Sequence, residues 1–430
     1  MFKLFDILGA YRKTKGLRFD DRTALETYQQ TQLDRMQARL VKQSPYFARY
    51  ADRSWSQWPL MDKQVMMSNF DSMNTAGLKL DKVLETALLA EQSRSFSPTV
   101  DGYTVGLSSG TSGSRGVFVV GPREKNRWAG IMLAKALPRG LFAGERVALF
   151  LRANSNLYTA VRTPFLKFEF FDLLAGWEQH LERLERYQPT VIVAPAQVLR
   201  RLALEQQAGR IAIAPARLLS AAEVLEQQDR DLITSVFGPV LGEVYQATEG
   251  FLGVTCSYGQ LHLNEEFIHV EPEWLDSEHR RFVPIVTDFS RETQPVVRYR
   301  LNDILVASHV QCPCGSATRV ISSIEGRCDD MLRLPATGGG QVELFADAIS
   351  RILLQSLPLE TDYRLIQTSA SELLLEADLG AATRDKVVTA LDAFFEEQGV
   401  DLPLRWTFST QTPDVDFSRK RRRIVRRWQA

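Results

Sequence analysis

Short apolar segments alternate with helical segments between residues 146 and 248. The helical segments, at 177–187 and 222–237, carry apolar residues at helical spacing. The apolar segments between and around them are rich in β-branched or aromatic residues, as strands are: RVALFLRA (146–153), FEFFDLLA (168–175), TVIVAP (190–195), ARLLSAA (216–222) and EVYQAT (243–248). This alternation predicts an α/β fold with a largely parallel sheet.

The regions on either side have different patterns. Residues 20–51 have helical spacing with a break at Ser44-Pro45, so we expect the N-terminal part to be mainly helical. After about residue 255, shorter strand-like segments predict an antiparallel subdomain. The last hundred or so residues show the order strand, helix, strand, strand, helix, strand and basic tail. We predict a large N-terminal α/β domain (1–325), a hinge (326–330) and a small, mobile α+β C-terminal domain (331–430).

Charge and hydropathy argue against some classes of protein. The 52 basic and 52 acidic residues cancel, so no overall field attracts nucleic acid. No stretch approaches the roughly 18 apolar residues of a membrane span. The four cysteines fit a reducing compartment, and we expect a cytoplasmic protein. Residues 418–430 nevertheless hold seven basic residues and no acid. This tail could be a patch for an acidic carrier protein, nucleic acid or anionic lipid.

The stretch GLSSGTSGSRGVFVV (106–120) places glycines and hydroxyl residues between two strand-like runs. Glycine permits close approach of the backbone, and N–H and hydroxyl groups can donate to anionic oxygens, which suits a phosphate. The stretch lacks the Gly-Lys-Ser/Thr ending and the following helix of a Walker A loop. Because the same composition is typical of a hairpin loop, both interpretations stand at this point.

A second pattern combines three cysteines with a histidine. Three thiolates and one imidazole complete a closed tetrahedral set, which predicts a structural Zn²⁺ that fixes the antiparallel subdomain. The predicted ligands are Cys256, His262, Cys312 and Cys314, with Cys328 and His269 in reserve. Buried cysteines without a metal are the alternative.

Five motifs follow one another along the chain. They are SSGTSGSRG (108–116), SAAEV (220–224), YQATEG (245–250), RYRLND (298–303) and GRCDDML (326–332). In order and spacing they resemble the adenylate-forming superfamily of acyl- and aryl-CoA synthetases. The CPCG segment (312–315) is most similar to the phenylacetate-CoA ligase branch and to related synthetases described as adenylylating a deazaflavin coenzyme.

The resemblance implies an ATP- and Mg²⁺-dependent ligase. In such enzymes a carboxylate attacks the α-phosphate of ATP, pyrophosphate leaves, and an acyl- or aryl-adenylate forms. A thiol of CoA or of an acyl carrier protein then takes the acyl group. Because two anions must meet, the protein has to position them and neutralise charge.

The resemblance also implies the residues that bind the nucleotide. The β- and γ-phosphates would be wrapped by Ser108, Ser109, Gly110, Thr111, Ser112 and Gly113. Many relatives carry a lysine after the last glycine, where this chain has Ser114, so Arg115 would supply the cation. Ala222 and Glu223 would hold the adenine edge. A helix N-terminus that favours an acid explains Glu223 equally well.

Three further residues belong to the nucleotide site by the same resemblance. Tyr245 would stack on adenine, Thr248 would bind the α-phosphate, and Glu249 would hold Mg²⁺, which prefers oxygen ligands. A core tyrosine and a solvated turn acid are the alternative. Asp303 would bind both ribose hydroxyls with support from Arg300, unless the two form an ordinary surface ion pair.

The hinge and the basic tail complete the implied site. Arg327 would reach the ribose or phosphates, and Asp329 or Asp330 would be the pivot of the C-terminal domain. Lys420 would reach the α-phosphate as a compact cation.

The acid and the acceptor are less constrained. Residues 151–176 lack the glycine-rich segment of phenylacetate ligases and carry Phe165, Phe168, Phe170 and Phe171, which favours an aromatic acid unless these rings form core. The segment LPATGGGQVELF (334–345) departs from the family's usual lid. An enzyme that stops at an AMP adduct, a non-catalytic nucleotide-binding protein and a homodimer therefore all stay open.

Overall fold

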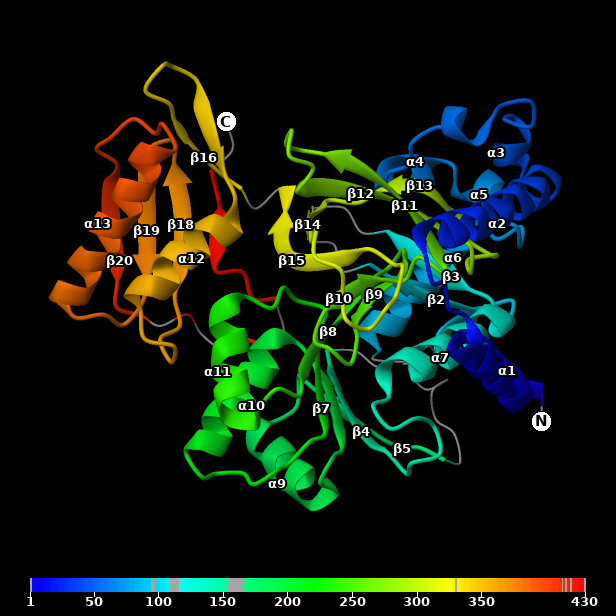
Figure 1. Cartoon of the computed structure of the whole chain (residues 1–430), viewed down its shortest axis with the longest axis horizontal. Helices are drawn as coiled ribbons and strands as arrows, with labels where there is room; N and C mark the ends of the chain where they lie inside the picture. The colour runs from blue at the N-terminus through cyan, green and yellow to red at the C-terminus, as the bar shows by residue number, and fades with distance from the viewer. Residues whose placement is uncertain are drawn as a thin grey trace.

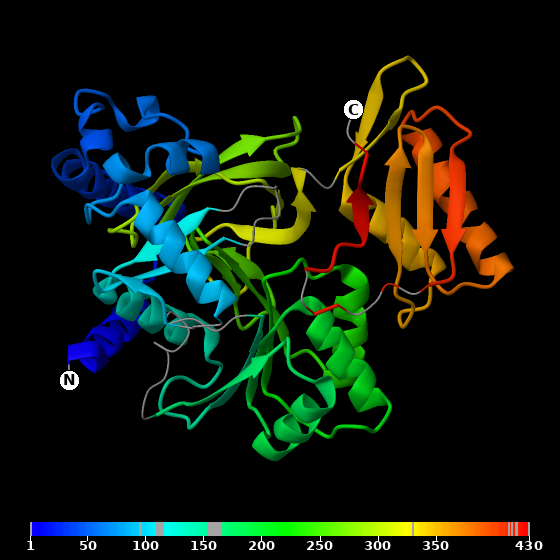
Figure 2. The same ribbon diagram turned by 180° about the vertical axis from the view of Figure 1, so that it is seen from behind.

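The chain folds into a large N-terminal unit and a smaller C-terminal unit. Figure 1 shows the smaller unit in orange and red at one side of the larger one, and Figure 2 shows the same arrangement from behind. The computed structural model describes residues 2–93, 97–108, 116–152, 165–328, 331–411, 413, 416–417 and 420–428.

The described N-terminal part is helical, as predicted. Its helices are α1 (Phe2–Gly16), α2 (Arg22–Gln43), α3 (Pro45–Ala48), the 3-10 helix η1 (Trp55–Gln57), α4 (Lys63–Ser68), α5 (Phe70–Met73) and α6 (Leu80–Gln92). The break at Ser44-Pro45 is confirmed. Ser44 ends α2, and its hydroxyl accepts a hydrogen bond from the Phe47 N–H at the start of α3.

A small antiparallel sheet flanks the glycine- and serine-rich loop. It consists of β1 (Thr99–Val100), β2 (Tyr103–Leu107) and β3 (Val117–Val120), and α7 (Pro122–Ala136) follows it. Ser108 closes the β2–β3 hairpin, because its N–H donates to the Gly116 carbonyl at 2.8 Å and its hydroxyl accepts from the Gly116 N–H at 2.9 Å. The hairpin is therefore present, and it is compatible with a phosphate-binding loop at its tip.

Twelve strands of the described chain form one sheet that contains the predicted parallel region. Its parallel strands lie in the order β5, β4, β6, β7, β8. These strands and the helices that connect them are β4 (Arg146–Leu151), β5 (Lys167–Asp172), α9 (Trp177–Tyr187), β6 (Val191–Ala194), α10 (Ala196–Gln207), β7 (Arg217–Ala221), α11 (Gln227–Phe237) and β8 (Leu241–Ala247). Helix α11 begins at Gln227. Residues 222–226, which were predicted to be helical, are therefore not part of the helix.

The antiparallel region continues the same sheet from the point where β8 pairs with β9. Its strands are β9 (Gly250–Thr255), β10 (Leu261–Leu263), β11 (Ile268–Trp274), β12 (Arg281–Asp288), β13 (Val296–Arg300), β14 (Asp303–Ala307) and β15 (Val320–Arg327). The predicted subdomain is therefore antiparallel, but it shares one hydrogen-bonded sheet with the parallel region.

The C-terminal unit has its own sheet and core. Its elements are β16 (Leu332–Pro335), β17 (Gln341–Leu344), α12 (Ala346–Ser356), β18 (Arg364–Ser369), β19 (Glu372–Glu376), α13 (Ala381–Glu397), β20 (Arg405–Ser409) and β21 (Ile424–Arg426). The sheet order is β20, β19, β18, β21. Two features differ from the prediction: the first strand is a β16–β17 hairpin, and the basic tail contains β21, beside which Arg423 is buried.

The C-terminal unit lies next to α11. The red segment before β21 passes between the C-terminal sheet and this helix in both views. Among the described helices, none combines the length and the apolar character that crossing a bilayer requires.

Candidate active site

Three of the predicted site residues meet at the ends of β8, β14 and β15. The Tyr245 hydroxyl donates to Asp303 Oδ2 at 2.7 Å, and Arg327 Nε lies 3.7 Å from Asp303 Oδ1. The sheet causes this arrangement, because Asp303 and Arg327 are register partners on adjacent antiparallel strands. The structure therefore brings together Tyr245, Asp303 and Arg327.

Tyr245 also holds Asp303 in place. Its ring is 8% exposed and belongs to the hydrophobic core, and burial followed by the Asp303 carboxylate raises its pKa well above the usual value. The hydroxyl therefore stays protonated and donates to Asp303. Stacking of this ring on adenine stays a prediction.

Arg300 does not support Asp303, contrary to the prediction. Its guanidinium forms a two-point ion pair with Glu273, with Nη2 at 2.6 Å from Oε1 and Nε at 2.8 Å from Oε2. Arg327 is the arginine that lies beside Asp303.

Thr248 and Glu249 follow β8 and line a small cavity that opens to solvent. Burial raises the pKa of the Glu249 carboxyl above its usual value, and the nearby Asp303 adds to the effect. A buried carboxyl of this kind fits a hard cation, because Mg²⁺ would stabilise its ionised form. Ser108 lines the same cavity, so the start of the glycine- and serine-rich loop lies near the predicted magnesium ligand.

Two basic residues that the sequence analysis did not single out line this cavity as well. Lys63 is the first residue of α4, and Arg291 lies in the turn after β12. Neither belongs to a motif, and both are far from the glycine-rich loop in sequence. Only the fold brings them next to Thr248 and Glu249.

Lys420 reaches the same site from the C-terminal part of the chain. Burial lowers the pKa of its ammonium group, and the nearby Arg327 lowers it further, while Asp303 and Glu223 act in the opposite direction. Lys420 is therefore within electrostatic range of Asp303, Glu223 and Arg327.

The Glu223 carboxylate contacts residues of the N-terminal unit and of the basic tail. Its Oε1 accepts from Arg152 at 2.7 Å, from the Gln197 side chain at 2.7 Å and from the Arg421 N–H at 3.4 Å. Since α11 begins four residues later, the alternative interpretation of Glu223 as a helix N-terminal acid is wrong. Ala222 has a left-handed backbone, with φ 67°. Contact of Ala222 and Glu223 with adenine stays a prediction.

Several predicted residues lie outside the described part of the chain. They are Ser109, Gly110, Thr111, Ser112, Gly113 and Arg115 of the loop, and Asp329 and Asp330 of the hinge. In the predicted acid-binding region, the Phe171 ring is fully buried and stacks on Phe150 at 4.5 Å, so it is core. Phe165 is 39% exposed and packs against Phe142.

The predicted metal ligands form one cluster. One ligand atom from each of Cys256, His262, Cys312 and Cys314 lies within 4.8 Å of the others. Cys256 Sγ is 3.6 Å from Cys312 Sγ, and Cys314 Sγ is 3.4 Å from His262 Nε2. His262 Nδ1 lies 2.9 Å from Thr318 Oγ1, which leaves Nε2 directed at the sulfur atoms.

The two reserve ligands lie elsewhere. His269 Nδ1 contacts Gln29, and the Cys328 N–H donates to the Asn302 carbonyl in the hinge region. The Cys/His cluster also lies away from the predicted nucleotide site along the strands. β9 begins directly after Glu249 and ends directly before Cys256, so its six residues span about 20 Å between the two.

Solved structures of ligases have a similar fold, and one of them carries an acyl-adenylate. The 2-hydroxyisobutyryl-CoA ligase in its postadenylation state with R3-HIB-AMP matches with a TM-score of 0.66 at 16% identity, over 94% of this chain and 89% of that chain. The same ligase in its thioesterification state has a TM-score of 0.53 at 17% identity and the same coverage. The amide bond synthetase McbA from Marinactinospora thermotolerans gives 0.54 at 14% identity, over 75% and 68% of the two chains.

The chain therefore has the fold of the adenylate-forming ligases, with the C-terminal domain included, and the predicted fold class is confirmed. No family model matches the sequence, and no curated protein does.

Proposed function

We propose that this chain is an ATP- and Mg²⁺-dependent carboxylic acid ligase that makes an acyl- or aryl-adenylate and then a thioester. The observation that carries the proposal is the position of Lys420. Its ammonium group, from the C-terminal part of the chain, is near enough to Asp303 and Arg327 for both to act on its pKa. The fold around it is one in which 2-hydroxyisobutyryl-CoA ligase holds an acyl-AMP.

Lys420 and Thr248 would act on the reacting phosphate. When the substrate carboxylate oxygen forms its bond to the α-phosphorus, the bond to pyrophosphate breaks and negative charge shifts to the leaving group. A compact ammonium group beside the α-phosphate reduces the repulsion between the two anions. The Thr248 hydroxyl would donate to an α-phosphate oxygen and fix its orientation.

Charge on the leaving pyrophosphate would be balanced at the cavity. Lys63 and Arg291 support this role because they line the cavity together with Ser108, Thr248 and Glu249. They offer positive charge where Ser114 replaces the loop lysine of many relatives. Glu249 would hold Mg²⁺, which supplies charge neutralisation between the phosphates when bound.

The ribose and adenine would bind along β8 and β14. Asp303 is ionisable, lies at the start of β14 and receives a hydrogen bond from Tyr245, so it can accept from the ribose hydroxyls. Arg327 would contact ribose or phosphate from the neighbouring strand. Ala222, Glu223 and Tyr245 are the proposed contacts of the adenine ring.

A structural Zn²⁺ fits the Cys/His cluster. Three sulfur atoms and one imidazole nitrogen lie within 4.8 Å of one another, and Thr318 contacts the imidazole. Such a closed set of ligands would cross-link β9, β10 and the segment before β15 without taking part in the reaction.

The finer assignments are also proposals. Gly326, with φ 113°, supports a hinge at 326–330, and Leu332 is the first residue of the separate C-terminal core, which supports domains at 1–325 and 331–430. The phenylacetate ligase-like branch, an aromatic acid, a CoA or carrier-protein acceptor and a cytoplasmic location rest on the sequence pattern.

ATP–pyrophosphate exchange tests the proposed function. The purified chain with Mg²⁺ would be assayed against aryl, arylalkanoic, hydroxy and fatty acids, and the active acid would then be offered CoA. We expect exchange that depends on one class of acid. Thioester formation identifies the acceptor as CoA, and acyl-adenylate accumulation identifies an enzyme that stops at the AMP adduct. Binding of ATP without exchange for any acid would contradict the proposal and favour a non-catalytic nucleotide-binding protein.

A further inference from the structure

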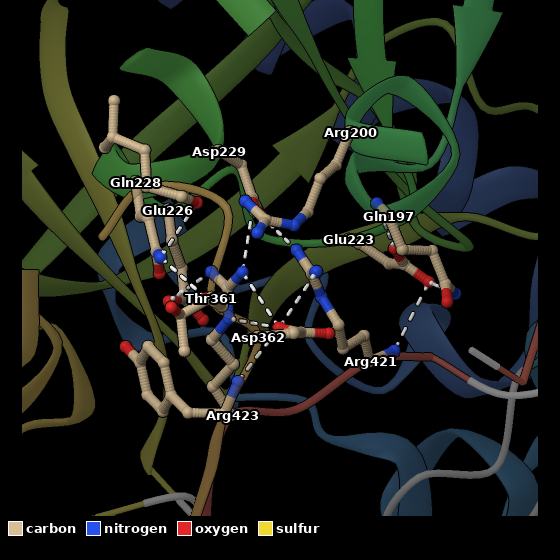
Figure 3. Close-up of polar contacts among 12 residues, drawn as sticks. Gln197, Arg200, Glu223, Glu226, Gln228, Asp229, Thr361, Asp362, Arg421 and Arg423 are labelled. Atoms are coloured by element: carbon tan, nitrogen blue, oxygen red, sulfur yellow. Dashed lines mark hydrogen bonds and ion pairs between the residues drawn. The ribbon is translucent and has the colours of Figure 1, made fainter. Parts of the chain in front are cut away.

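A buried group of charges joins the two units of the chain. It lies between α10 and α11 on the N-terminal side and the segments before β18 and β21 on the C-terminal side (Figure 3). We call it the Asp229 cluster, and its members are Arg200, Glu226, Asp229, Asp362, Arg421 and Arg423.

Asp229 is the centre of this cluster. Its Oδ1 accepts from Arg423 Nη2 at 2.9 Å and from Arg200 Nη1 at 3.3 Å, and its Oδ2 forms an ion pair with Arg421. The side chains of Asp229 and Arg423 are both fully buried. Burial alone would raise the pKa of the Asp229 carboxyl, but Arg421, Arg423 and Arg200 together hold it below its usual value.

Positive and negative charges of the Asp229 cluster balance across the boundary between the two units. Arg423 also pairs with Glu226 at 3.0 Å and with Asp362 at 3.1 Å, so three guanidinium groups face three carboxylates. Charges buried to this extent need partners, and removal of one partner is strongly destabilising. Contact between the two units is therefore favoured in the orientation that completes these pairs.

Each side nevertheless keeps a counter-ion of its own. If the units separate, Asp229 retains Arg200, and Arg423 retains Asp362. Arg200 Nη2 is buried and has no hydrogen-bond partner among the described residues. It could therefore donate to the Asp229 carboxylate when Arg421 and Arg423 move away. The cluster can therefore open without leaving an isolated buried charge.

The cluster is connected directly to Lys420. Arg421 is the next residue, its guanidinium is held by Asp229, and its N–H faces Glu223 Oε1. Next to Asp229 on α11, Gln228 Nε2 adds contacts of 2.8–3.2 Å to the carbonyl oxygens of residues 358, 359 and 361. The backbone on which Lys420 depends is thus attached to α11.

We propose that Asp229 is a positioning residue for adenylate formation, which holds the C-terminal unit and Lys420 in the orientation of the first half-reaction and releases them for the second. The inference rests on the proposed function. The orientation agrees with the comparison above, in which the postadenylation state of 2-hydroxyisobutyryl-CoA ligase matches better than its thioesterification state.

The test separates the two half-reactions in an Asp229→Asn variant. We expect ATP–pyrophosphate exchange to fall at least about tenfold, because a misplaced catalytic cation slows the step it serves. Thioester formation from supplied acyl-adenylate should stay the same or increase. Arg421→Gln, which leaves Asp229 with two arginines, is the second variant in case Asp229→Asn does not fold. Equal loss of both half-reactions in a folded variant, or no loss in either, would overturn the proposal.

A second readout does not depend on activity. Hydrogen–deuterium exchange of ligand-free protein should become faster in α11 and in residues 420–428 of the variant and stay unchanged around the Cys/His cluster. The matched control is Glu376→Gln, which removes an ion pair with Arg364 inside the C-terminal sheet. Unchanged protection in α11 would overturn the positioning role even if no acid supports exchange. If the wild type showed no ATP–pyrophosphate exchange but the variant showed faster hydrogen–deuterium exchange in α11, the result would count against the proposed function alone.

Discussion

The Cys/His cluster and the Lys420 site are assembled in different ways. The four ligands of the cluster come from residues 256–314, within one antiparallel region: the pairing of β9 with β10 places Cys256 near His262, and the loop between β14 and β15 supplies Cys312 and Cys314. The Lys420 site combines strands of the large sheet with a residue that precedes the last strand of the C-terminal unit, so it depends on how two units are oriented. We therefore expect the first to be a permanent structural element and the second to form and come apart as the units move.

The largest effect that separates the two regions is expected from Lys420→Ala. Loss of one cation at the reacting phosphate should reduce ATP–pyrophosphate exchange by roughly 100-fold. Thioester formation from supplied acyl-adenylate and the melting temperature should be preserved. Lys386→Ala, on the exposed side of α13, is the control. If both half-reactions lost activity equally, Lys420 would have no special role in the first one.

The Cys/His cluster should give the opposite result. We expect Cys312→Ser to lose bound zinc, measured by elemental analysis, and to melt about 5 °C lower or more, because a cross-link between strands is lost. At low temperature, where Cys312→Ser remains folded, the ratio between the rates of its two half-reactions should be the same as in the wild type. Cys328→Ser, outside the cluster, should keep its zinc. Metal-free wild-type protein that is as stable as untreated wild type would rule out a structural zinc.

A smaller effect is expected at the ribose contact. Asp303→Ala should weaken ATP binding by about tenfold, since it removes a charged acceptor. Tyr245→Phe should have a smaller effect in the same direction, because it removes only the hydroxyl that orients Asp303. Isothermal titration with a non-hydrolysable ATP analogue measures both. Unchanged affinity in Asp303→Ala would contradict the ribose role.

The smallest effect concerns the pH dependence of stability at Asp288. This carboxyl lies beside Gly250, where an added Cβ would be 2.5 Å from Asp288 Oδ2, and burial raises its pKa to about 6. The folded state therefore binds a proton more tightly than the unfolded state, and the free energy of unfolding falls as the pH rises from about 4 to about 6, by at most about 1.4 kcal/mol per pH unit. Asp288→Asn should lose this contribution. Urea denaturation at several pH values would then show that the difference in free energy of unfolding between wild type and variant changes with pH. A constant difference would contradict the raised pKa.

Short-range sequence signals predicted much of the molecule. The strand and helix alternation, the Ser44-Pro45 break and the antiparallel region were all predicted, because each depends on local periodicity or on a capping side chain. The Cys/His cluster was predicted as well, since few arrangements of three cysteines and one histidine satisfy one metal.

Contacts between distant segments could not be predicted in the same way. Arg300 was assigned to support Asp303 by the resemblance of the RYRLND motif, yet it pairs with Glu273 on another strand. Arg423 was counted in a basic tail that could bind an acidic partner, although it pairs with Asp229 on α11, 194 residues earlier. Lys63 and Arg291 gave no signal at all, since the cavity that they share exists only in the folded chain.

The six residues of β9 also affect how the protein should respond to temperature. One end of this strand leads to Glu249 and the other to Cys256, so a metal at Cys256 would restrain the far end of the segment that carries the proposed magnesium ligand. Without that restraint, thermal displacement of the strand would grow on warming and would broaden the distribution of Glu249 positions. Metal depletion should then lower the temperature optimum of the reaction even at temperatures where the protein remains folded.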